Sequence, residues 1–474
     1  MKNLYSDTIV APATTPGTGA ISIVRISGPD AFSIVDKVVQ LNHGTVRESI
    51  AYTINFGEIY SGDALLDQVL VSVFKAPHSY TGEDAVEIST HASAYIVEEL
   101  IRLLIDSGAR MAEPGEFTKR AFINGKMDLT QAEAVADVIS STTQASHRVA
   151  MNQLKGGFSN ELDTLRNELI ETASLLELEL DFSEEEVEFA SRDRLLSLLE
   201  LSIGHVHRLV SSFKQGNMIK NGVPVAIVGS TNAGKSTLLN ALLGEDRAIV
   251  SDIAGTTRDT IEETLTIGGI LFRFIDTAGL RDSDDTIERI GIERAIRKLS
   301  QAEIVLGMLD GSAALSSLID SAASIFSRVD RDSQKLFFLL NKCDLLSNSD
   351  INKIVSDVNN SVLPSDYKVN IINLSAKSGK GVEELKNALF VAEKDLLPNA
   401  ETTLVTNLRH FEALRRAEAS LADCRTSLSR NFPTDLVAED LRRAIACIND
   451  ILGKDILNPD TILRSIFRNH CIGK

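Results

Sequence analysis

A phosphate-binding loop constrains this chain more than any other feature of its sequence. The segment that starts at Val223 reads VPVAIVGSTNAGKS, and the part from Gly229 to Ser236 fits the pattern GxxxxGK[ST]. An apolar run precedes this loop, and a helical apolar pattern from Thr237 to Leu243 follows it. Because such a loop joins a strand to a helix, the sequence predicts a nucleotide-binding α/β domain around it.

Each residue type in the loop has a role in holding phosphate. Gly229 and Gly234 let backbone N–H groups turn inward as an anion nest, and the helix that begins here adds the positive end of its dipole. Lys235 can reach the β and γ phosphates, and the Ser236 hydroxyl can bind Mg²⁺. We therefore expect GTP contacts from Gly229, Asn232, Ala233, Gly234, Lys235, Ser236 and Thr237.

Three further motifs follow in the order that a GTPase requires. They are Asp276-Thr277-Ala278-Gly279, Asn341-Lys342-Cys343-Asp344 and Ser375-Ala376-Lys377. In the first motif, Asp276 ends an apolar strand and can meet Mg²⁺ through water, while Gly279 offers a backbone N–H to the γ-phosphate. In the second, Asp344 can accept hydrogen bonds from N1–H and the 2-amino group of guanine, which adenine cannot supply. The motifs predict a guanine nucleotide as the ligand.

The residue after the DTAG segment bears on the mechanism. Ras-like enzymes place a glutamine there to orient the attacking water, whereas this chain has Leu280. The acidic segment that follows offers Glu288 as the catalytic residue in its place. The alternative is that Glu288 is only a first-turn acid that favours a helix dipole.

A second departure is Asn232 inside the phosphate loop. The residues after Val250 form an extended loop in which Thr257 is the natural second hydroxyl for Mg²⁺. Asn232 and oxygens of this loop can hold a monovalent cation where other GTPases receive an arginine finger, since the charge requirement is the same. We expect nucleotide or metal contacts from Ser251, Asp252, Ile253, Ala254, Gly255, Thr256 and Thr257.

Composition limits the remaining function classes. The chain has 66 acidic and 48 basic residues, a net charge of −18, which argues against coating nucleic acid by charge alone but leaves a local basic patch open. Its four cysteines form no CxxC pair, so we expect neither a zinc site nor a disulfide framework. Without a signal-peptide pattern or a long apolar run, we expect a soluble cytoplasmic protein with no membrane partner.

Periodicity predicts a multidomain α/β chain of 474 residues. The expected parts are an α+β domain at 1–120, helical segments at 121–220 and 397–474, and a Ras-like P-loop G domain at 221–396. Both helical segments flank the G domain, so we expect them to pack together and the G domain to be an insertion. Arg25 and Glu87 interrupt apolar strands, and the simpler interpretation is that they are strand-end residues facing water, with a ligand site as the alternative.

Three signatures outside the nucleotide motifs carry a closer resemblance. They are SYTGED at 79–84, PGEFTKRAF at 114–122 and the terminal CIGK. With these segments, the chain resembles the MnmE (TrmE) family of tRNA-modification GTPases over essentially its whole length. The resemblance implies a cytoplasmic homodimer joined through N-terminal domains that are similar to folate-binding domains and hold a formyl-tetrahydrofolate derivative. By motif, Arg25, Glu87, Lys126 and Lys474 line that pocket.

The same resemblance implies the reaction. With the FAD-dependent partner MnmG, in a heterotetramer or larger complex, the family installs a carboxymethylaminomethyl or aminomethyl group on the wobble uridine of certain tRNAs. It also implies K⁺ bound by Asn232, Ser251, Ile253 and Thr256, with Glu288 orienting the water. Cys471 matches a family cysteine of possible use in the modification chemistry, and Ser251 replaces a threonine while keeping the hydroxyl.

A regulatory binding module is the alternative to a tRNA-modifying enzyme. An Era-like switch in ribosome assembly predicts GTP-dependent co-sedimentation with ribosomal subunits and no folate binding. The C-terminal region shows no basic or aromatic pattern of an RNA-binding domain, which weakens this alternative.

Overall fold

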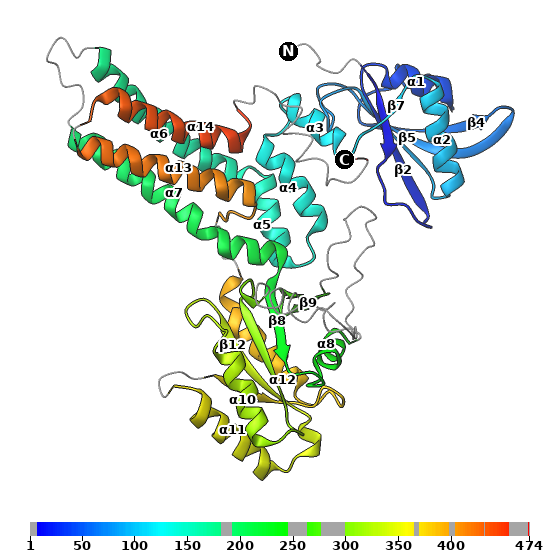
Figure 1. The fold of residues 1–474 in the computed structure, drawn as a ribbon. Helices are drawn as coiled ribbons and strands as arrows, with labels where there is room; N and C mark the ends of the chain where they lie inside the picture. The colour runs from blue at the N-terminus through cyan, green and yellow to red at the C-terminus, as the bar shows by residue number, and fades with distance from the viewer. Residues whose placement is uncertain are drawn as a thin grey trace, which may run out of the picture. The chain divides into compact units, whose positions relative to one another are not determined.

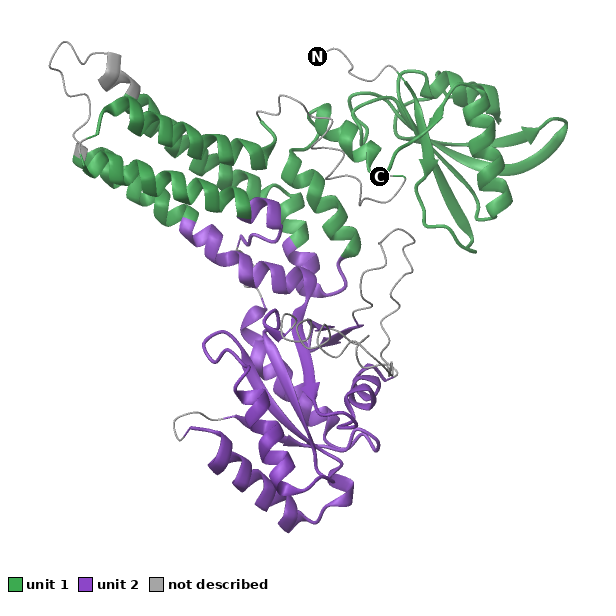
Figure 2. Cartoon of the chain, in the orientation of Figure 1, with its two compact units in different colours: residues 1–140, 150–206, 412–474 green, residues 141–149, 207–411 purple. Residues whose placement is uncertain are grey.

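The computed structural model describes residues 7–181, 192–244, 263–275, 299–364, 369–397, 403–430, 432–454 and 473. They belong to two compact units, coloured separately in Figure 2. The first unit comprises residues 1–140, 150–206 and 412–474, and the second comprises 141–149 and 207–411. Within the described residues, no helix is both long enough and apolar enough to cross a bilayer.

A seven-stranded sheet with two helices forms the N-terminal part of the first unit (Figure 1). Its strands, in sheet order, are β3 (Val39–Leu41), β4 (Thr53–Ser61), β5 (Ala64–Phe74), β6 (Ala85–His91), β2 (Ile21–Ser27), β1 (Ile9–Pro12) and β7 (Arg110–Met111). Helices α1 (Ala31–Val38) and α2 (Ala94–Asp106) supply Ile34, Val35, Leu100 and Leu104 to a core shared with the sheet. The α+β character that the sequence predicts for this part is confirmed, and alternate side chains of β2 and β5 are buried in its core.

One face of β4 and β5 leaves large apolar side chains exposed. Ile54 and Phe56 on β4 are 67% and 43% exposed, and Leu70 on β5 is 47% exposed. Phe56 lies directly opposite Leu70 in the strand register, so their side chains form one apolar surface. An exposed apolar patch of this kind marks an interaction surface.

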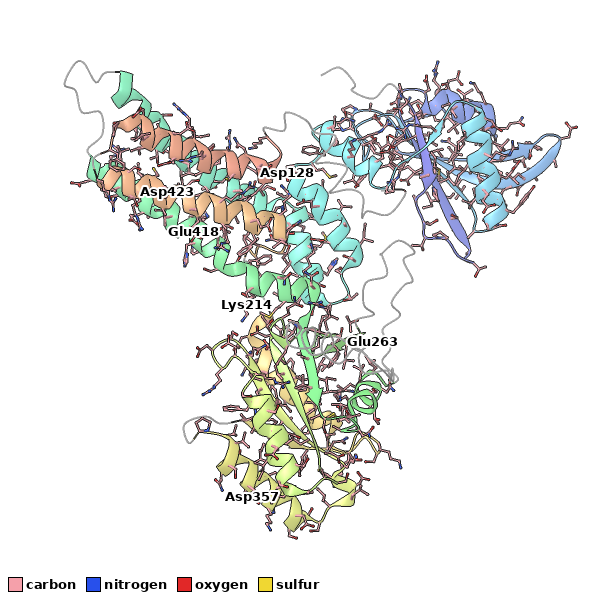
Figure 3. All side chains as sticks on the ribbon, viewed as in Figure 1. Asp128, Lys214, Glu263, Asp357, Glu418 and Asp423 are labelled. Carbon is pink, nitrogen blue, oxygen red and sulfur yellow. The ribbon has the colours of Figure 1, made fainter. Side chains whose placement is uncertain are left out.

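Seven helices form the helical region of the described chain. They are α3 (Glu116–Ile123), α4 (Leu129–Ser140), α5 (Gln144–Leu154), α6 (Gly157–Asp181), α7 (Arg192–Asn221), α13 (Leu408–Ser429) and α14 (Thr434–Leu452). Asp128 caps α4, since its Oδ1 accepts a hydrogen bond of 2.9 Å from the backbone N–H of Gln131 (Figure 3). The apolar side chains Leu162, Leu165 and Leu169 of α6, which recur at helical spacing, are buried.

Helices from both sides of the nucleotide domain pack together in the first unit. α14 packs along α6, and Arg166 Nε donates a 2.6 Å hydrogen bond to Asn449 Oδ1 between them. The predicted pairing of the two helical segments is therefore confirmed. The chain leaves the helical region, forms the nucleotide domain and returns, so that domain is an insertion.

A six-stranded sheet organises the nucleotide domain. Its strands, in sheet order, are β13 (Asn370–Asn373), β12 (Lys335–Asn341), β11 (Ile304–Asp310), β8 (Val223–Gly229), β10 (Ile270–Ile275) and β9 (Glu263–Ile267). All neighbours are parallel except β9, which pairs with β10 in an antiparallel hairpin turned at Gly268-Gly269. The helices are α8 (Lys235–Leu243), α10 (Leu315–Phe326), α11 (Asn348–Val362) and α12 (Val382–Glu393), with short 3₁₀ turns η2 (Cys343–Leu345) and η3 (Lys394–Leu396).

The buried side chains of this domain form two apolar clusters. One includes α8 and α12 residues such as Leu238 and Leu385, and the other includes α10 and α11 residues such as Leu318 and Val358. Since β8, β11 and β12 run parallel, their carboxyl ends lie at one edge of the sheet, where doubly wound folds bind ligands. The phosphate loop follows β8 at this edge, and the NKCD motif begins where β12 ends.

Candidate functional site

The phosphate loop has the backbone shape that an anion nest needs. Asn232 and Gly234 have φ values of 65° and 97°, in the left-handed region. Lys235 Nζ donates hydrogen bonds to the carbonyl oxygens of Gly229, at 3.0 Å, and Ser230, at 2.9 Å. Burial lowers the pKa of Lys235, because desolvation disfavours its charged form. The ammonium group is thus held within the loop whose backbone N–H groups receive phosphate.

Asn341 connects the phosphate loop to both guanine motifs. Its Nδ2 donates a 2.7 Å hydrogen bond to the carbonyl oxygen of Ala233, and its Oδ1 accepts a 2.9 Å hydrogen bond from the backbone N–H of Ala376. A Cβ atom at Gly234 would lie 2.4 Å from this Nδ2, so the contact requires glycine. The structure therefore brings together the GKS, NKCD and SAK segments, which the sequence placed in three separate motifs.

Asp344 is the residue for which the sequence predicts contact with the guanine base. It is exposed at the turn after β12, where the buried Ser375 hydroxyl donates a hydrogen bond to it. This hydrogen bond, together with the positive charges of Lys377 and Lys380, lowers the pKa of Asp344. The carboxylate is ionised at neutral pH and can accept the two N–H donors of guanine.

Part of the predicted nucleotide site lies outside the described residues. This part comprises Ser251, Asp252, Ile253, Ala254, Gly255, Thr256, Thr257, Asp276, Thr277, Ala278, Gly279 and Glu288. Within the described part, Ser236 and Thr237 occupy the first turn of α8, and Asn232 is exposed in the loop before it. The roles assigned to these twelve residues in binding GTP, Mg²⁺ or K⁺ or in orienting the water therefore stay predictions.

The interpretation of Arg25 and Glu87 as strand-end residues facing water is wrong. Arg25 lies in the middle of β2 and Glu87 directly opposite it on β6. Their ion pair joins Arg25 Nη2 to Glu87 Oε1 at 2.7 Å, and the two side chains are only 17% and 26% exposed. A charge can occupy the interior of a sheet because its partner occupies the neighbouring strand.

Arg25 is also covered by aromatic rings and approached by the C-terminus. Its guanidinium carbon lies 5.3 Å from the ring centre of Tyr80 and 5.6 Å from that of Phe117, within the range of cation–π attraction. Its Nη1 donates a 3.4 Å hydrogen bond to the carbonyl oxygen of Gly473. Lys474 and Cys471 lie outside the described residues, but Gly473 between them is at Arg25.

Lys126 lies along the SYTGED segment that also supplies Tyr80. Lys126 Nζ donates a 3.1 Å hydrogen bond to the carbonyl oxygen of Pro77, and a Cβ atom at Gly82 would lie 3.4 Å from the Lys126 side chain. The same short segment therefore contacts both Arg25 and Lys126. Two of the predicted pocket residues, Arg25 and Lys126, thus lie beside the same segment, and the described interactions include no direct contact between them.

A buried ionic network beneath this segment was missed from the sequence. Arg120 is 0% exposed and donates hydrogen bonds to Glu83, Glu116 and the Asp7 carboxylate. Arg110 also pairs with Asp7 and Glu116. Glu83 belongs to SYTGED, and Glu116 and Arg120 belong to PGEFTKRAF, so the network ties the two signature segments together. The available signal was Glu116 and Arg120, an acid and a base four residues apart and therefore on one face of a helix.

Glu116 shows how strongly this network favours its ionised form. Burial by itself raises the pKa of Glu116, but hydrogen bonds from Arg110, the Glu113 backbone and Arg120 outweigh burial and lower it below the ordinary value. The carboxylate is only 4% exposed. The segment that carries Tyr80 is thus anchored by charge, as well as by the Ser27 hydroxyl, which donates a 2.8 Å hydrogen bond to Glu83.

The fold and the nucleotide site define the class of protein. A doubly wound sheet with a P-loop, an NKCD motif and an Asn341 that joins the phosphate loop to the SAK segment is a P-loop GTPase domain, here inserted in the helical region that follows the α+β domain in the sequence. The chain is a GTP hydrolase.

Comparison with known proteins supplies the particular family. Residues 8–126 match the model for the GTP-binding protein TrmE N-terminus, and residues 129–471 match the MnmE helical domain. The chain is 49% identical over 473 residues to the tRNA modification GTPase MnmE of Bacteroides thetaiotaomicron, with 99% of this chain and 100% of the relative covered. The Porphyromonas gingivalis relative of the same name is 46% identical, with 100% and 99% covered. The chain belongs to the MnmE family of tRNA modification GTPases.

Two solved structures are similar to part of the chain. The FeoB G-domain from Methanococcus jannaschii is 26% identical, and the match covers 36% of this chain and 98% of that chain with a TM-score of 0.25. Era in complex with MgGDPNP and a 16S ribosomal RNA fragment is 25% identical, with 42% and 66% covered and a TM-score of 0.29.

Proposed function

We propose that this chain is a potassium-stimulated GTPase that, with an FAD-dependent MnmG-type partner, forms the carboxymethylaminomethyl or aminomethyl group at the wobble uridine of certain tRNAs. The observation that carries the proposal is full-length similarity to relatives named as tRNA modification GTPases. The similarity includes the N-terminal domain as well as the GTPase domain. The substrate is tRNA, which favours a cytoplasmic location.

Nucleoside analysis of tRNA tests this function directly. Total tRNA from a strain that lacks the chain should lose the C5-substituted wobble uridine, and a plasmid copy of the chain should restore it. Mass spectrometry of digested tRNA measures both. An unchanged level of the modified nucleoside would reject the proposal, and GTP-dependent co-sedimentation with ribosomal subunits would then favour the ribosome-assembly alternative.

The position of Asn232 in the phosphate loop supports the proposal that potassium stimulates hydrolysis. Its exposed side chain lies in a left-handed turn of the phosphate loop, where an amide oxygen can face a cation beside the phosphates. Ser251, Ile253 and Thr256 are the other proposed ligands, while Ser236 and Thr257 are proposed for Mg²⁺. A monovalent cation at this position would neutralise charge that develops on the phosphates during hydrolysis.

Replacing K⁺ by Na⁺ at constant ionic strength should slow GTP hydrolysis by at least roughly tenfold, because the smaller ion does not fit a site built for K⁺. Steady-state phosphate release measures this effect. Asn232→Ala should remove the difference between the two cations. Equal rates in K⁺ and Na⁺ for the unmodified protein would contradict the cation assignment.

The reduced-folate site is proposed at Arg25, Glu87, Lys126 and Lys474. The Arg25–Glu87 pair is partly buried, and the Arg25 guanidinium lies within cation–π range of Tyr80 and Phe117. Gly473 contacts Arg25, and Lys126 contacts Pro77, next to the segment that carries Tyr80. Reduced folates carry a flat pteridine ring with N–H donors and a carboxylate tail. A carboxylate, a guanidinium and a lysine beside aromatic rings suit these groups.

Lys126→Ala should weaken binding of 5-formyl-tetrahydrofolate by about tenfold, since it removes one charge-assisted contact with the ligand. The GTP hydrolysis rate should stay unchanged. Isothermal titration measures the affinity, and Lys37→Ala, an exposed lysine on α1, is the matched control. A folate affinity equal to that of the Lys37 variant would exclude Lys126 from the pocket.

Homodimerisation through the N-terminal domain is proposed from the apolar surface of β4 and β5. Ile54, Phe56 and Leu70 are large apolar side chains that lie exposed on the same sheet face, and such a patch marks an interaction surface. A second copy of the chain supplies the same surface, so a two-fold contact can cover both. A larger complex with the MnmG-type partner would assemble on this dimer.

A further inference from the structure

An aspartate outside the four nucleotide motifs, Asp310, forms an ion pair with Lys342, the lysine of NKCD. Lys342 Nζ lies 2.7 Å from Asp310 Oδ2, and the two side chains are 31% and 16% exposed. Asp310 ends β11 at the same level as Asn341 ends β12, so the strand register places Asp310 next to the motif. Lys342 has φ 63°, one of three positive values at non-glycine positions in the described chain.

The turn after β11 is built to hold Asp310 in place. Asp310 Oδ1 accepts hydrogen bonds from the Ser312 backbone N–H, at 2.9 Å, and from the Ser312 hydroxyl, at 2.6 Å. Gly311 N–H donates to the carbonyl oxygen of Asn341 at 3.0 Å, and a Cβ atom at Gly311 would lie 2.6 Å from that oxygen. Only glycine allows this approach. The turn is thus pinned to the NKCD loop, and one carboxylate oxygen stays directed at Lys342.

The electrostatics keep Asp310 ionised. Burial raises its pKa, but hydrogen bonds from Lys342 and Ser312 outweigh burial and lower the pKa below its ordinary value. Because Asp310 has two oxygens, it can hold Ser312 with one and Lys342 with the other. The ammonium of Lys342 is therefore anchored by groups of the protein itself.

We propose that Asp310 is a positioning residue for guanine nucleotides and that it acts through Lys342. A lysine side chain can cover a flat ring with its apolar stem while its ammonium group remains solvated or paired. With the ammonium fixed by Asp310 and the backbone fixed in the left-handed turn, the Lys342 stem is ordered beside Asp344, which reads the base edge. Without the anchor, nucleotide binding must order the Lys342 side chain itself.

Asp310→Asn should weaken binding of GDP and GTP equally, by about tenfold, because the anchor acts at the base and not at the γ-phosphate. The rate of hydrolysis at saturating GTP should remain that of the unmodified protein. Titration of a fluorescent GDP analogue and steady-state kinetics measure the two quantities. Asp320→Asn, an exposed aspartate on α10, is the matched control and should bind normally.

A double-mutant cycle separates this role from a general structural one. In a Lys342→Met background, which keeps the stem and removes the charge, Asp310→Asn should change GDP affinity by less than about twofold. Effects that multiply in the double variant would overturn the proposal. Asp310→Glu, which moves the charge by one methylene, provides a second cycle with the same expectation if Asp310→Asn does not fold. The proposal would also be overturned if the folded Asp310→Asn chain bound GDP with normal affinity.

Discussion

Asp344→Asn should weaken binding of GTP and GDP on the order of a thousandfold, while nucleotides of xanthine become the better ligands. Asp344 is exposed and ionised, with its carboxylate oriented by Ser375. An asparagine offers one acceptor and one donor, so it loses the bond to the 2-amino group of guanine. The same donor can reach the carbonyl that xanthine carries at that position.

Competition titrations with GDP and XDP measure the exchange of specificity. Asp357→Asn makes the same chemical change on α11 and should leave both affinities at their original values. An Asp344→Asn chain that still prefers GDP over XDP would show that the base is read elsewhere. The result separates base recognition from phosphate binding, because Lys235 and its loop remain intact.

Arg120→Ala should destabilise the N-terminal domain by about 3–5 kcal/mol, because it leaves buried carboxylates without their partner. Arg120 is fully buried and contacts Glu83 and Glu116, each with a side chain only 4% exposed. Since the chain has several domains, the local measurement is hydrogen–deuterium exchange in β1, β2 and α3. Exchange there should become faster by about two to four orders of magnitude, as that free energy requires.

The control and the pH dependence follow from the same contacts. Arg102→Ala removes an exposed arginine that pairs with Glu99 and Asp106 on α2, so it should change hydrogen exchange little.

The folded pKa of Glu116 lies below its unfolded value, so the contribution of Glu116 to stability is present at neutral pH and is lost as pH falls through the folded pKa. Unchanged exchange in the Arg120 variant would show that the network contributes no net stability.

The sequence predicted most of the nucleotide domain because its signals are local. The apolar runs of β8, β11 and β12 are bounded by motifs whose glycines and polar residues mark the strand ends. Periodicity also predicted helical segments on both sides of this domain, since apolar residues recur at every third or fourth position, as at Leu162, Leu165 and Leu169 of α6. Such patterns depend only on residues a few positions apart.

Contacts between distant segments could not be read in the same way. The Arg25–Glu87 pair depends on the register of β2 against β6, and a shift of one residue would separate the two charges. The same applies to Asp310, which follows no nucleotide motif and gains its role only because β11 and β12 end together. The folate and potassium assignments rest on family resemblance, because neither ligand has a spacing rule that the sequence displays.

Asn341 has a consequence for how the ligand is held. A single side-chain amide restrains the phosphate loop with one end and the SAK loop with the other. We therefore expect base and phosphate recognition to be thermodynamically linked, because a fragment that binds at only one of the two loops changes the conformational freedom of the other. Guanosine and pyrophosphate should bind with positive cooperativity, even though they share no bond.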